Sequence, residues 1–375
     1  MKKIALVTIN DNDNYGNRLQ NFAVYSLLTN RNYDVENVIR IFGCELTPKR
    51  KIWRRKLDAL YPRAGKLKKI FFCLHIVGYY LGVKNKIIQR LKNFEAFNKN
   101  IKQAKLCFCK ETDYREVSNA YDYFVTGSDQ VWNPDLFSAE GLSLNMLDFT
   151  ENAKKIAIAP SIATDSLSEQ QKEMFVKNLS GFKYLSCREQ QGADLLSGLL
   201  KRPVDALVDP TLMLSADDWD KVSKKPKFHK EDKKYILLYF LGKITENYQK
   251  IIDNIRCQYG LEVINILDKR SKYYTCGPSE FIYLIKHSAL VLTDSFHGSV
   301  FSYIYDKPFR IFRRSDGDSM NSRLINLMKK LHLESSIYLS EKDDINNILE
   351  VSYDKSYLKQ EQEKFNNYLD KVFKE

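Results

Sequence analysis

Residues 289–302 read ALVLTDSFHGSVFS and decide the fold class of this chain. The apolar run Ala289 to Thr293 predicts a buried strand, and Phe296 to Tyr305 predict a helix whose first turn carries His297 and Gly298. Open α/β sheets bind ligands where a strand passes into a helix through a tight turn, because unpaired N–H groups of the helix start point into that crevice. We therefore expect an α/β fold in which His297 lies beside an anion.

The same alternation of strand and helix patterns occurs in both halves of the chain. Ile4 to Ile9 and Tyr121 to Thr126 predict buried strands in the first half, and Tyr235 to Phe240 begins a second series. A chain of 375 residues is too long for one ordinary core. We therefore expect two Rossmann-like domains that face each other across a cleft, divided as an N-terminal domain at 1–220, a lysine-rich linker at 221–234, a C-terminal domain at 235–350 and a final helical segment at 351–375.

A polar loop, Asn10 to Asn17 (NDNDNYGN), follows the first predicted strand. Gly16 is its only glycine, so the loop lacks the GxGxxG pattern, and nicotinamide and flavin cofactors are disfavoured. Its amide side chains can donate to and accept from sugar hydroxyls. Alternatively, these asparagines only cap and turn the chain. Asp129 and Gln130 follow the strand that ends at Thr126, so parallel strands would bring them to the same rim.

Arg188 follows a further predicted strand, Tyr184 to Cys187, and precedes a helix start. An arginine at the end of a buried strand can bind a carboxylate or a phosphate through two parallel hydrogen bonds. A surface ion pair with Glu189 or Asp194 is the alternative.

The seven cysteines are scattered and include no CxxC pair, which predicts reduced thiols and neither a disulfide framework nor a metal site. Only six apolar or neutral residues separate Lys3 from the polar loop at Asn10, too few for the apolar region of a signal peptide. We therefore expect a cytoplasmic protein.

Positive charge is concentrated in one segment of the chain. Between Lys49 and Lys105 there are 17 Lys or Arg residues and two acidic residues, in a chain of net charge +12. The uncharged stretch Ile70 to Val83 within it is shorter than the ~20 residues that cross a bilayer. Basic flanks and aromatic residues predict contact of residues 49–105 with an anionic membrane surface, and a core helix with a solvated basic edge is an equal alternative. No recognition motif for nucleic acid accompanies the charge, so nucleic acid is not an expected partner.

Six motifs occur in order along the chain: NYGNRLQNFA (14–23), YDYFVTGSDQVWNP (121–134), LSCREQQGADLL (185–196), LVDPTLML (207–214), DSFHGSVFS (294–302) and SRLINLMKKLHL (322–333). Together they resemble the polysaccharide pyruvyl transferase family. This resemblance implies a fold similar to the two-domain GT-B glycosyltransferases, with the C-terminal helix crossing back to the first domain. It also implies transfer of pyruvate from phosphoenolpyruvate to two hydroxyls of a sugar, giving a cyclic ketal and phosphate. The basic segment at 47–105 is the part without a counterpart and is an expected insertion.

The resemblance and the strand-end positions together give each candidate residue a role. Ketal formation needs an acid and several cationic groups, and His297 is the expected acid. Asp129 is expected to orient or deprotonate an acceptor hydroxyl, and phosphoenolpyruvate is the co-substrate with no cofactor and no metal. The expected donor-binding residues are Arg188, Lys243, Ser295, Gly298 and Arg323, and the expected acceptor-binding residues are Asn14, Asn17, Gln20, Ser128, Gln130 and Ser161.

One position departs from the family pattern S-x-R-x-H. The arginine expected two residues before His297 is Ser295 in this chain, so one anion-binding guanidinium is missing. The alternative function is therefore a GT-B glycosyltransferase that uses a nucleotide sugar, and a second alternative is a non-catalytic protein that associates with glycan or membrane. The expected partner is a sugar or oligosaccharide acceptor, free or lipid-linked.

Overall fold

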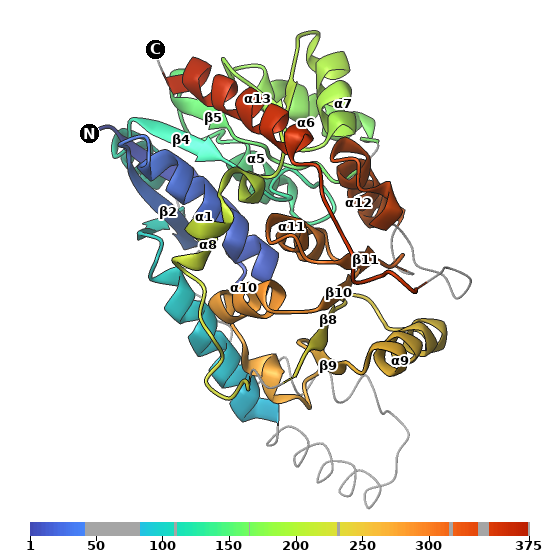
Figure 1. Ribbon diagram of the computed structural model, residues 1–375. Coiled ribbons are helices and arrows are strands. Elements are labelled where there is room, and N and C mark those ends of the chain that lie inside the picture. Colours follow the sequence, from blue (N-terminus) through green and yellow to red (C-terminus); the bar gives the residue numbers. More distant parts are fainter. Residues whose placement is uncertain are drawn as a thin grey trace, which may run out of the picture.

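The computed structural model describes residues 1–41, 83–108, 111–164, 166–230, 233–314, 318–336 and 345–373 (Figure 1). Two parallel sheets dominate it. The first contains β1 (Lys3–Val7), β2 (Asp34–Ile41), β3 (Gln103–Cys107), β4 (Tyr123–Thr126) and β5 (Lys155–Ala157), in the order β3-β2-β1-β4-β5. The second contains β8 (Tyr235–Tyr239), β9 (Glu262–Asn265), β10 (Leu290–Thr293) and β11 (Phe309–Ile311), in the order β11-β10-β8-β9.

Side chains of β1 alternate between two cores, as a strand buried on both faces requires. Ile4 and Leu6 join the core that contains α1 (Tyr15–Thr29), and Ala5 and Val7 join the core on the opposite face. Helices α5 (Ala139–Asn145), α6 (Glu169–Leu179) and α7 (Gln190–Leu200) cover that opposite face.

The first of these cores continues into the second half of the chain. It includes Leu237 and Tyr239 of β8 together with residues of α10 (Pro278–Lys286) and α11 (Phe296–Ile304). Ile236 and Leu238 of β8 point to a separate core, and α9 (Glu246–Tyr259) covers that side.

We call the contact between the two halves the seam, and α1 and α10 form its centre. The ring of Tyr15 stacks on that of Phe281 with 4.6 Å between ring centroids, and the Tyr15 hydroxyl donates to the carbonyl oxygen of Cys276 at 2.8 Å. Arg90, on a helix at residues 83–98, donates to the same hydroxyl. Buried aromatic packing therefore fixes the first turn of α1 against the second half.

The C-terminal helix α13 (Ser356–Phe373) lies along the first half, next to β5 in Figure 1. The Tyr368 hydroxyl donates to the carbonyl oxygen of Ala157 at 2.7 Å, and Gln362 donates to that of Leu212. The predicted α/β fold of two Rossmann-like units, with a C-terminal helix that crosses back, is confirmed.

The described residues also form three further α-helices and four short 3-10 helices (η). They are α4 (Glu111–Asn119), α8 (Ala216–Asp220), α12 (Asp318–Lys330), η1 (Asn152–Lys154), η2 (Pro210–Met213), η3 (Lys272–Thr275) and η4 (Glu334–Ser336).

The strand predicted at Tyr184 to Cys187 is shorter in the structure, and its partner strand is equally short. β6 covers only Ser186–Cys187, and β7 covers only Asp205–Ala206. After β7 the chain turns into η2, because Pro210 lacks an N–H for further strand pairing and has a backbone suited to a helix start. Asp209 caps η2 by accepting the N–H of Thr211 at 3.0 Å, which places its carboxylate at the end of the strand.

Residues 42–82, which hold most of the predicted membrane-contact segment, lie outside the described residues. Among the residues that are described, none of the helices is long and apolar enough to cross a bilayer.

Candidate active site

The turn after β10 places His297 at the seam. The side chain of Ser295 caps α11 by accepting the N–H of Gly298 at 3.5 Å, and Thr293 accepts the N–H of Ser295 at 3.0 Å. A Cβ added to Gly298 would lie 2.5 Å from the hydroxyl of Thr293, so this glycine lets α11 pack closely on the strand. Ser295 and Gly298, both expected to bind the donor, therefore shape the helix start that carries His297.

Gly16, in the first half of the chain, packs against the side chain of His297. A Cβ added to Gly16 would lie 2.0 Å from Nδ1 of His297. The imidazole thus packs directly against the first turn of α1, which Asn14 caps by accepting the N–H of Asn17 at 3.1 Å. Two helix starts, one from each half, therefore meet at His297, and their N–H groups favour negative charge there.

Asp209 links the two halves through one carboxylate oxygen. Oδ2 accepts from Nη1 of Arg188 at 2.7 Å and lies 3.7 Å from Nε2 of His297. The second distance is too long for a hydrogen bond but short enough for a charge pair when His297 is protonated. Thr211 fixes the other oxygen, Oδ1, by donating its hydroxyl at 2.6 Å and its N–H at 3.0 Å.

Burial by itself would raise the pKa of Asp209, because desolvation disfavours the charged carboxylate. His297, Arg188 and the Thr211 hydroxyl outweigh this effect and hold the pKa of Asp209 well below its usual range. Asp209 is therefore an anion at neutral pH and a poor general base.

Arg188 is 5% exposed and has acidic neighbours on three sides. Nε donates to Glu189 at 3.2 Å, and Nη1 lies 3.7 Å from Oδ1 of Asp129 in addition to its bond with Asp209. Burial lowers the pKa of Arg188, but Glu189, Asp209 and Asp129 raise it further, so the group stays charged. The expected ion pair of Arg188 with Glu189 is present, but it is buried and does not lie at the surface. Asp194, the other expected partner of Arg188, accepts a hydrogen bond from Gln190.

Two nitrogens at this point have no hydrogen-bond partner in the described part of the chain. They are Nη2 of Arg188 and Nε2 of His297, on residues that are both more than nine-tenths buried. Buried polar nitrogens without a partner cost free energy, and a bound anion would supply a partner for a nitrogen that carries a proton.

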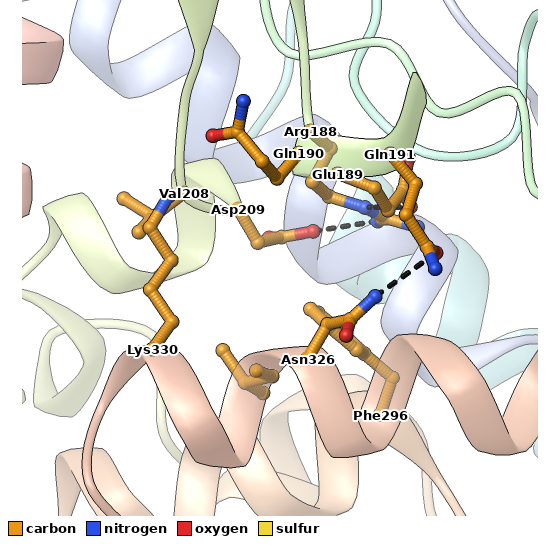
Figure 2. A pocket seen from close by; sticks show the side chains of 10 residues that line it. Arg188, Glu189, Gln190, Gln191, Val208, Asp209, Phe296, Asn326 and Lys330 are labelled. Atoms are coloured by element: carbon orange, nitrogen blue, oxygen red, sulfur yellow. Dashed lines mark hydrogen bonds and ion pairs between the residues drawn. The ribbon is translucent and has the colours of Figure 1, made fainter. Parts of the chain in front are cut away.

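A cavity of about 400 Å³ adjoins the carboxylate of Asp209 (Figure 2). The guanidinium of Arg188 borders it and lies over the ring of Phe296 at 4.8 Å. Asn326 of α12 closes one side by donating to Gln191 of α7 at 3.0 Å. His297 is not among the lining residues, because it lies between Gly16 and Asp209. The lining consists of Arg188, Glu189, Gln190, Gln191, Val208, Asp209, Phe296, Asn326, Leu327 and Lys330.

The rim of the first half brings Asn17 and Asp129 together. Nδ2 of Asn17 donates to Oδ2 of Asp129 at 3.1 Å, and Asp129 adopts a left-handed backbone with φ of 62°. Through Arg188 this pair connects to Asp209 and His297. Gln130 lies next to Asp129 and accepts from Asn133 at 2.8 Å.

Gln20, Ser128 and Ser161 are fully buried, and their polar groups bond to protein atoms. Gln20 accepts the N–H of Ser128 at 3.1 Å, the Ser128 hydroxyl donates to Ala159, and the Ser161 hydroxyl donates to Glu189 at 2.6 Å. In this arrangement the three side chains support the loops. Their predicted contact with an acceptor stays a prediction.

The loop after β8 binds a carboxylate of the protein itself. Asp294 accepts the N–H groups of Leu241 and Gly242 at 2.6 and 2.7 Å, and Arg314 lies 3.4 Å from the same carboxylate. The expected donor ligand Lys243 is exposed beside this loop. Arg323 belongs to α12, but its side chain lies outside the described residues.

The sequence did not predict a role for Asp209, the contact of Gly16 with His297, or the position of Arg314 beside Asp294. Asp209 was detectable, since it stands in the quoted motif LVDPTLML. Within the described residues, no group of three His, Cys, Asp or Glu side chains is arranged to hold a metal ion.

Comparison with known proteins gives one family match and several distant structural likenesses. A putative UDP-N-acetylglucosamine 2-epimerase from Listeria monocytogenes is 13% identical over 99% of this chain and 90% of that chain, with a TM-score of 0.49. UDP-GlcNAc 2-epimerase from Methanocaldococcus jannaschii is 11% identical over 96% and 92%, also at 0.49. MurG from Acinetobacter baumannii is 8% identical over 99% and 98%, at 0.40. These likenesses say nothing about what this chain binds.

No curated protein matches the sequence. The family model described as polysaccharide pyruvyl transferase matches residues 14–316, which include every candidate site residue except Arg323.

Proposed function

The chain belongs to the polysaccharide pyruvyl transferase family, and on that premise we propose that it transfers pyruvate from phosphoenolpyruvate to two hydroxyls of a saccharide acceptor. The observation that supports this most is the buried contact of Arg188, Asp209 and His297. These residues come from both halves of the chain, and Arg188 and Asp209 line the cavity. Two of their nitrogens have no hydrogen-bond partner among the described residues.

Arg188 binds the donor in this proposal. Phosphoenolpyruvate carries a carboxylate and a phosphate, and Nη2 of Arg188 can donate a charge-assisted hydrogen bond to either. The adjoining cavity of about 400 Å³ is within the size range of small-molecule sites. Asp129, Glu189 and Asp209 keep the guanidinium in a fixed orientation, so little side-chain freedom is lost when the donor binds.

His297 is the acid. Gly16 and Asp209 cover its ring from two sides, so the donor reaches Nε2 only after a small opening of the seam. Closure then returns the ring to its place and excludes water from the cationic intermediate. Asp209 stays ionised 3.7 Å from Nε2 and does not take the proton itself.

The reaction balances with the groups named. His297 donates a proton to the methylene carbon, which becomes a methyl group and leaves a cationic centre on the neighbouring carbon. One sugar oxygen attacks that carbon, and a second displaces phosphate to close the ketal. Of the two protons lost by the hydroxyls, one restores His297 and the other leaves with phosphate. Asp129, held by Asn17, is placed to orient the first hydroxyl.

Position 295 lacks the arginine of the family pattern, and Arg314 offers a replacement charge. Its guanidinium lies beside Asp294, three residues before His297. We assign it a supporting role in attracting the anionic donor to the start of α11.

The test is release of phosphate from phosphoenolpyruvate in the presence of saccharide acceptors, with the ketal product identified by mass spectrometry. We expect release that depends on the acceptor and is lost in His297→Ala while the melting temperature stays near that of the wild type. Acceptor-independent release, or full activity of the variant, would contradict the proposal.

The same preparation distinguishes the glycosyltransferase alternative. Stabilisation by nucleoside diphosphates but not by phosphoenolpyruvate would favour nucleotide-sugar chemistry. A protein that neither ligand class stabilises, and that releases no phosphate, would be the non-catalytic alternative.

A further inference from the structure

A second cavity, of about 580 Å³, has a strongly cationic lining. It shares no lining residue with the cavity beside Arg188. Lys86 comes from the helix at 83–98 in the first half, Lys224 and Lys227 from the segment that connects the halves, and Lys272 from η3 in the second half. We call this site the lysine cavity.

The positive charges of the lysine cavity have little compensation. None of its four lysines forms an ion pair with a carboxylate in the described ranges of the chain. Lys86 donates to the carbonyl oxygens of Arg270 and Lys269 at 2.5 and 3.4 Å, and Lys272 donates to that of Phe228 at 3.3 Å. Carbonyl groups fix these ammonium groups in place but carry no net charge, so the positive potentials add.

Glu280 is the one carboxylate among the described lining residues, and it already has a structural task. Its Oε2 accepts the N–H of Gly277 at 3.0 Å and so caps the start of α10. Burial raises the pKa of Glu280, although backbone N–H groups and the charge of Lys224 lower it, so this one carboxylate offsets only part of the charge of the four lysines. A concave surface lined by one sign of charge concentrates ions of the opposite sign.

We propose that the lysine cavity binds the diphosphate group of an anionic ligand. Ammonium groups act as separate point charges for phosphate, and four of them spread over three segments suit several anionic oxygens better than one phosphate. Under the proposed function, the ligand that carries this diphosphate is a diphosphate-linked saccharide acceptor, and this identification rests on that function. The binding of a diphosphate group to the lysine cavity does not depend on the proposed function.

The lysine cavity borders the same seam as His297. Arg90, one helical turn after Lys86, donates to the hydroxyl of Tyr15, and the next residue, Gly16, contacts His297. An acceptor anchored in the cavity therefore contacts both halves of the chain at the interface where the reaction is proposed.

The experiment measures binding of inorganic pyrophosphate to the full chain by calorimetry. The test variant is Lys224→Gln with Lys227→Gln, two exposed positions outside the proposed catalytic groups. The control is Lys250→Gln with Lys359→Gln, which removes the same charge from exposed positions on α9 and α13. We expect the test pair to weaken pyrophosphate binding at least about tenfold, and the control pair to change it less than about twofold.

Three results would overturn the inference. Equal weakening in both pairs would indicate non-specific attraction, and inorganic phosphate binding as tightly as pyrophosphate would indicate a single-anion site. Loss of flotation with phosphatidylglycerol vesicles in the test pair, without competition by pyrophosphate, would indicate a membrane surface instead.

Activity separates this inference from the proposed function. With a phosphate-free saccharide acceptor, the test pair should transfer pyruvate as the wild type does. A wild type that transfers no pyruvate but binds pyrophosphate through these lysines would refute the function and leave the diphosphate site intact.

Discussion

Gly16 and His297 touch across the seam between the two halves. A Cβ on Gly16 would lie 2.0 Å from Nδ1 of the imidazole, closer than any two such atoms can approach. The position of the proposed acid therefore depends on the absence of one side chain on the opposite half. This contact makes the relative placement of the halves part of the site.

Gly16→Ala should displace the imidazole or hold the seam open. Since a misplacement of about 1 Å can cost about 100-fold in rate, we expect a loss of that order in pyruvyl transfer. Initial rates with saturating phosphoenolpyruvate measure it. Gly198→Ala in α7 is the matched control, because nothing lies within 4 Å of a Cβ there, and its activity should equal that of the wild type. Equal activity of the two variants would contradict the role of the contact.

Arg188→Lys keeps the positive charge but removes the planar group. Lysine cannot bond to Asp209 and Glu189 and also present the equivalent of Nη2 to a ligand. We expect the thermal stabilisation by phosphoenolpyruvate to disappear and its apparent affinity to fall roughly 10- to 100-fold. Arg202→Lys, a change at an arginine that bonds to the carbonyl of Leu179, should leave donor binding unchanged.

Glu36 predicts a defined pH dependence of stability. Burial raises its pKa, but hydrogen bonds from Tyr121, Lys3 and Lys102 outweigh that and lower it to about 2. A lowered folded-state pKa means that the stabilisation is present above the unfolded value of about 4.3 and is lost as the pH falls towards 2. After allowance for solvent screening, we expect Glu36→Gln to cost about 1 kcal/mol at pH 7 and almost nothing near pH 2.

Urea denaturation of the wild type and Glu36→Gln between pH 7 and pH 2.5 tests this expectation. Glu262→Gln is the control, because its pair with Lys233 is largely exposed and should contribute little at any pH. A stability difference between wild type and Glu36→Gln that stays constant with pH would contradict the assigned ion pairs.

The fold was predictable because its signals are local. Strands β1, β8 and β10 are apolar runs of a few residues, and helices such as α10 and α13 have apolar positions at helical spacing. The strand predicted at Tyr184 to Cys187 was overestimated because Leu185 is apolar and buried without belonging to β6. Apolar residues indicate burial, but a segment forms a strand only where its backbone pairs with a neighbouring strand.

The site was predictable only in part because its contacts join distant segments. His297 and Arg188 stand at strand ends, which a sequence can show. That Asp209 meets both, or that Gly16 lies on the imidazole, depends on the packing of α11 and η2 against α1. Lys243 also follows a strand, but the backbone N–H groups of its loop already bind Asp294. Because Asp294 lies 52 and 53 residues further along the chain than the two residues that donate, the sequence does not show this contact.

Asp209→Asn tests whether charge or shape holds Arg188 and His297 together. Asparagine has the same size and can still accept from Thr211, so the turn at η2 should survive. It removes the buried anion that pairs with the guanidinium of Arg188, which should destabilise the protein by about 3 kcal/mol at pH 7. Because the folded-state pKa of Asp209 is depressed, this difference should shrink as the pH falls below about 4.

The catalytic effect of Asp209→Asn should be separable from this instability. If the carboxylate also positions His297, the rate of transfer at saturating phosphoenolpyruvate should fall in addition to the donor affinity, whereas a role through Arg188 alone would lower only the affinity. Asp209→Glu, which keeps the charge but displaces it by one methylene, should restore donor affinity while recovering only part of the rate. An unchanged saturated rate in Asp209→Asn would mean that Asp209 serves Arg188 alone.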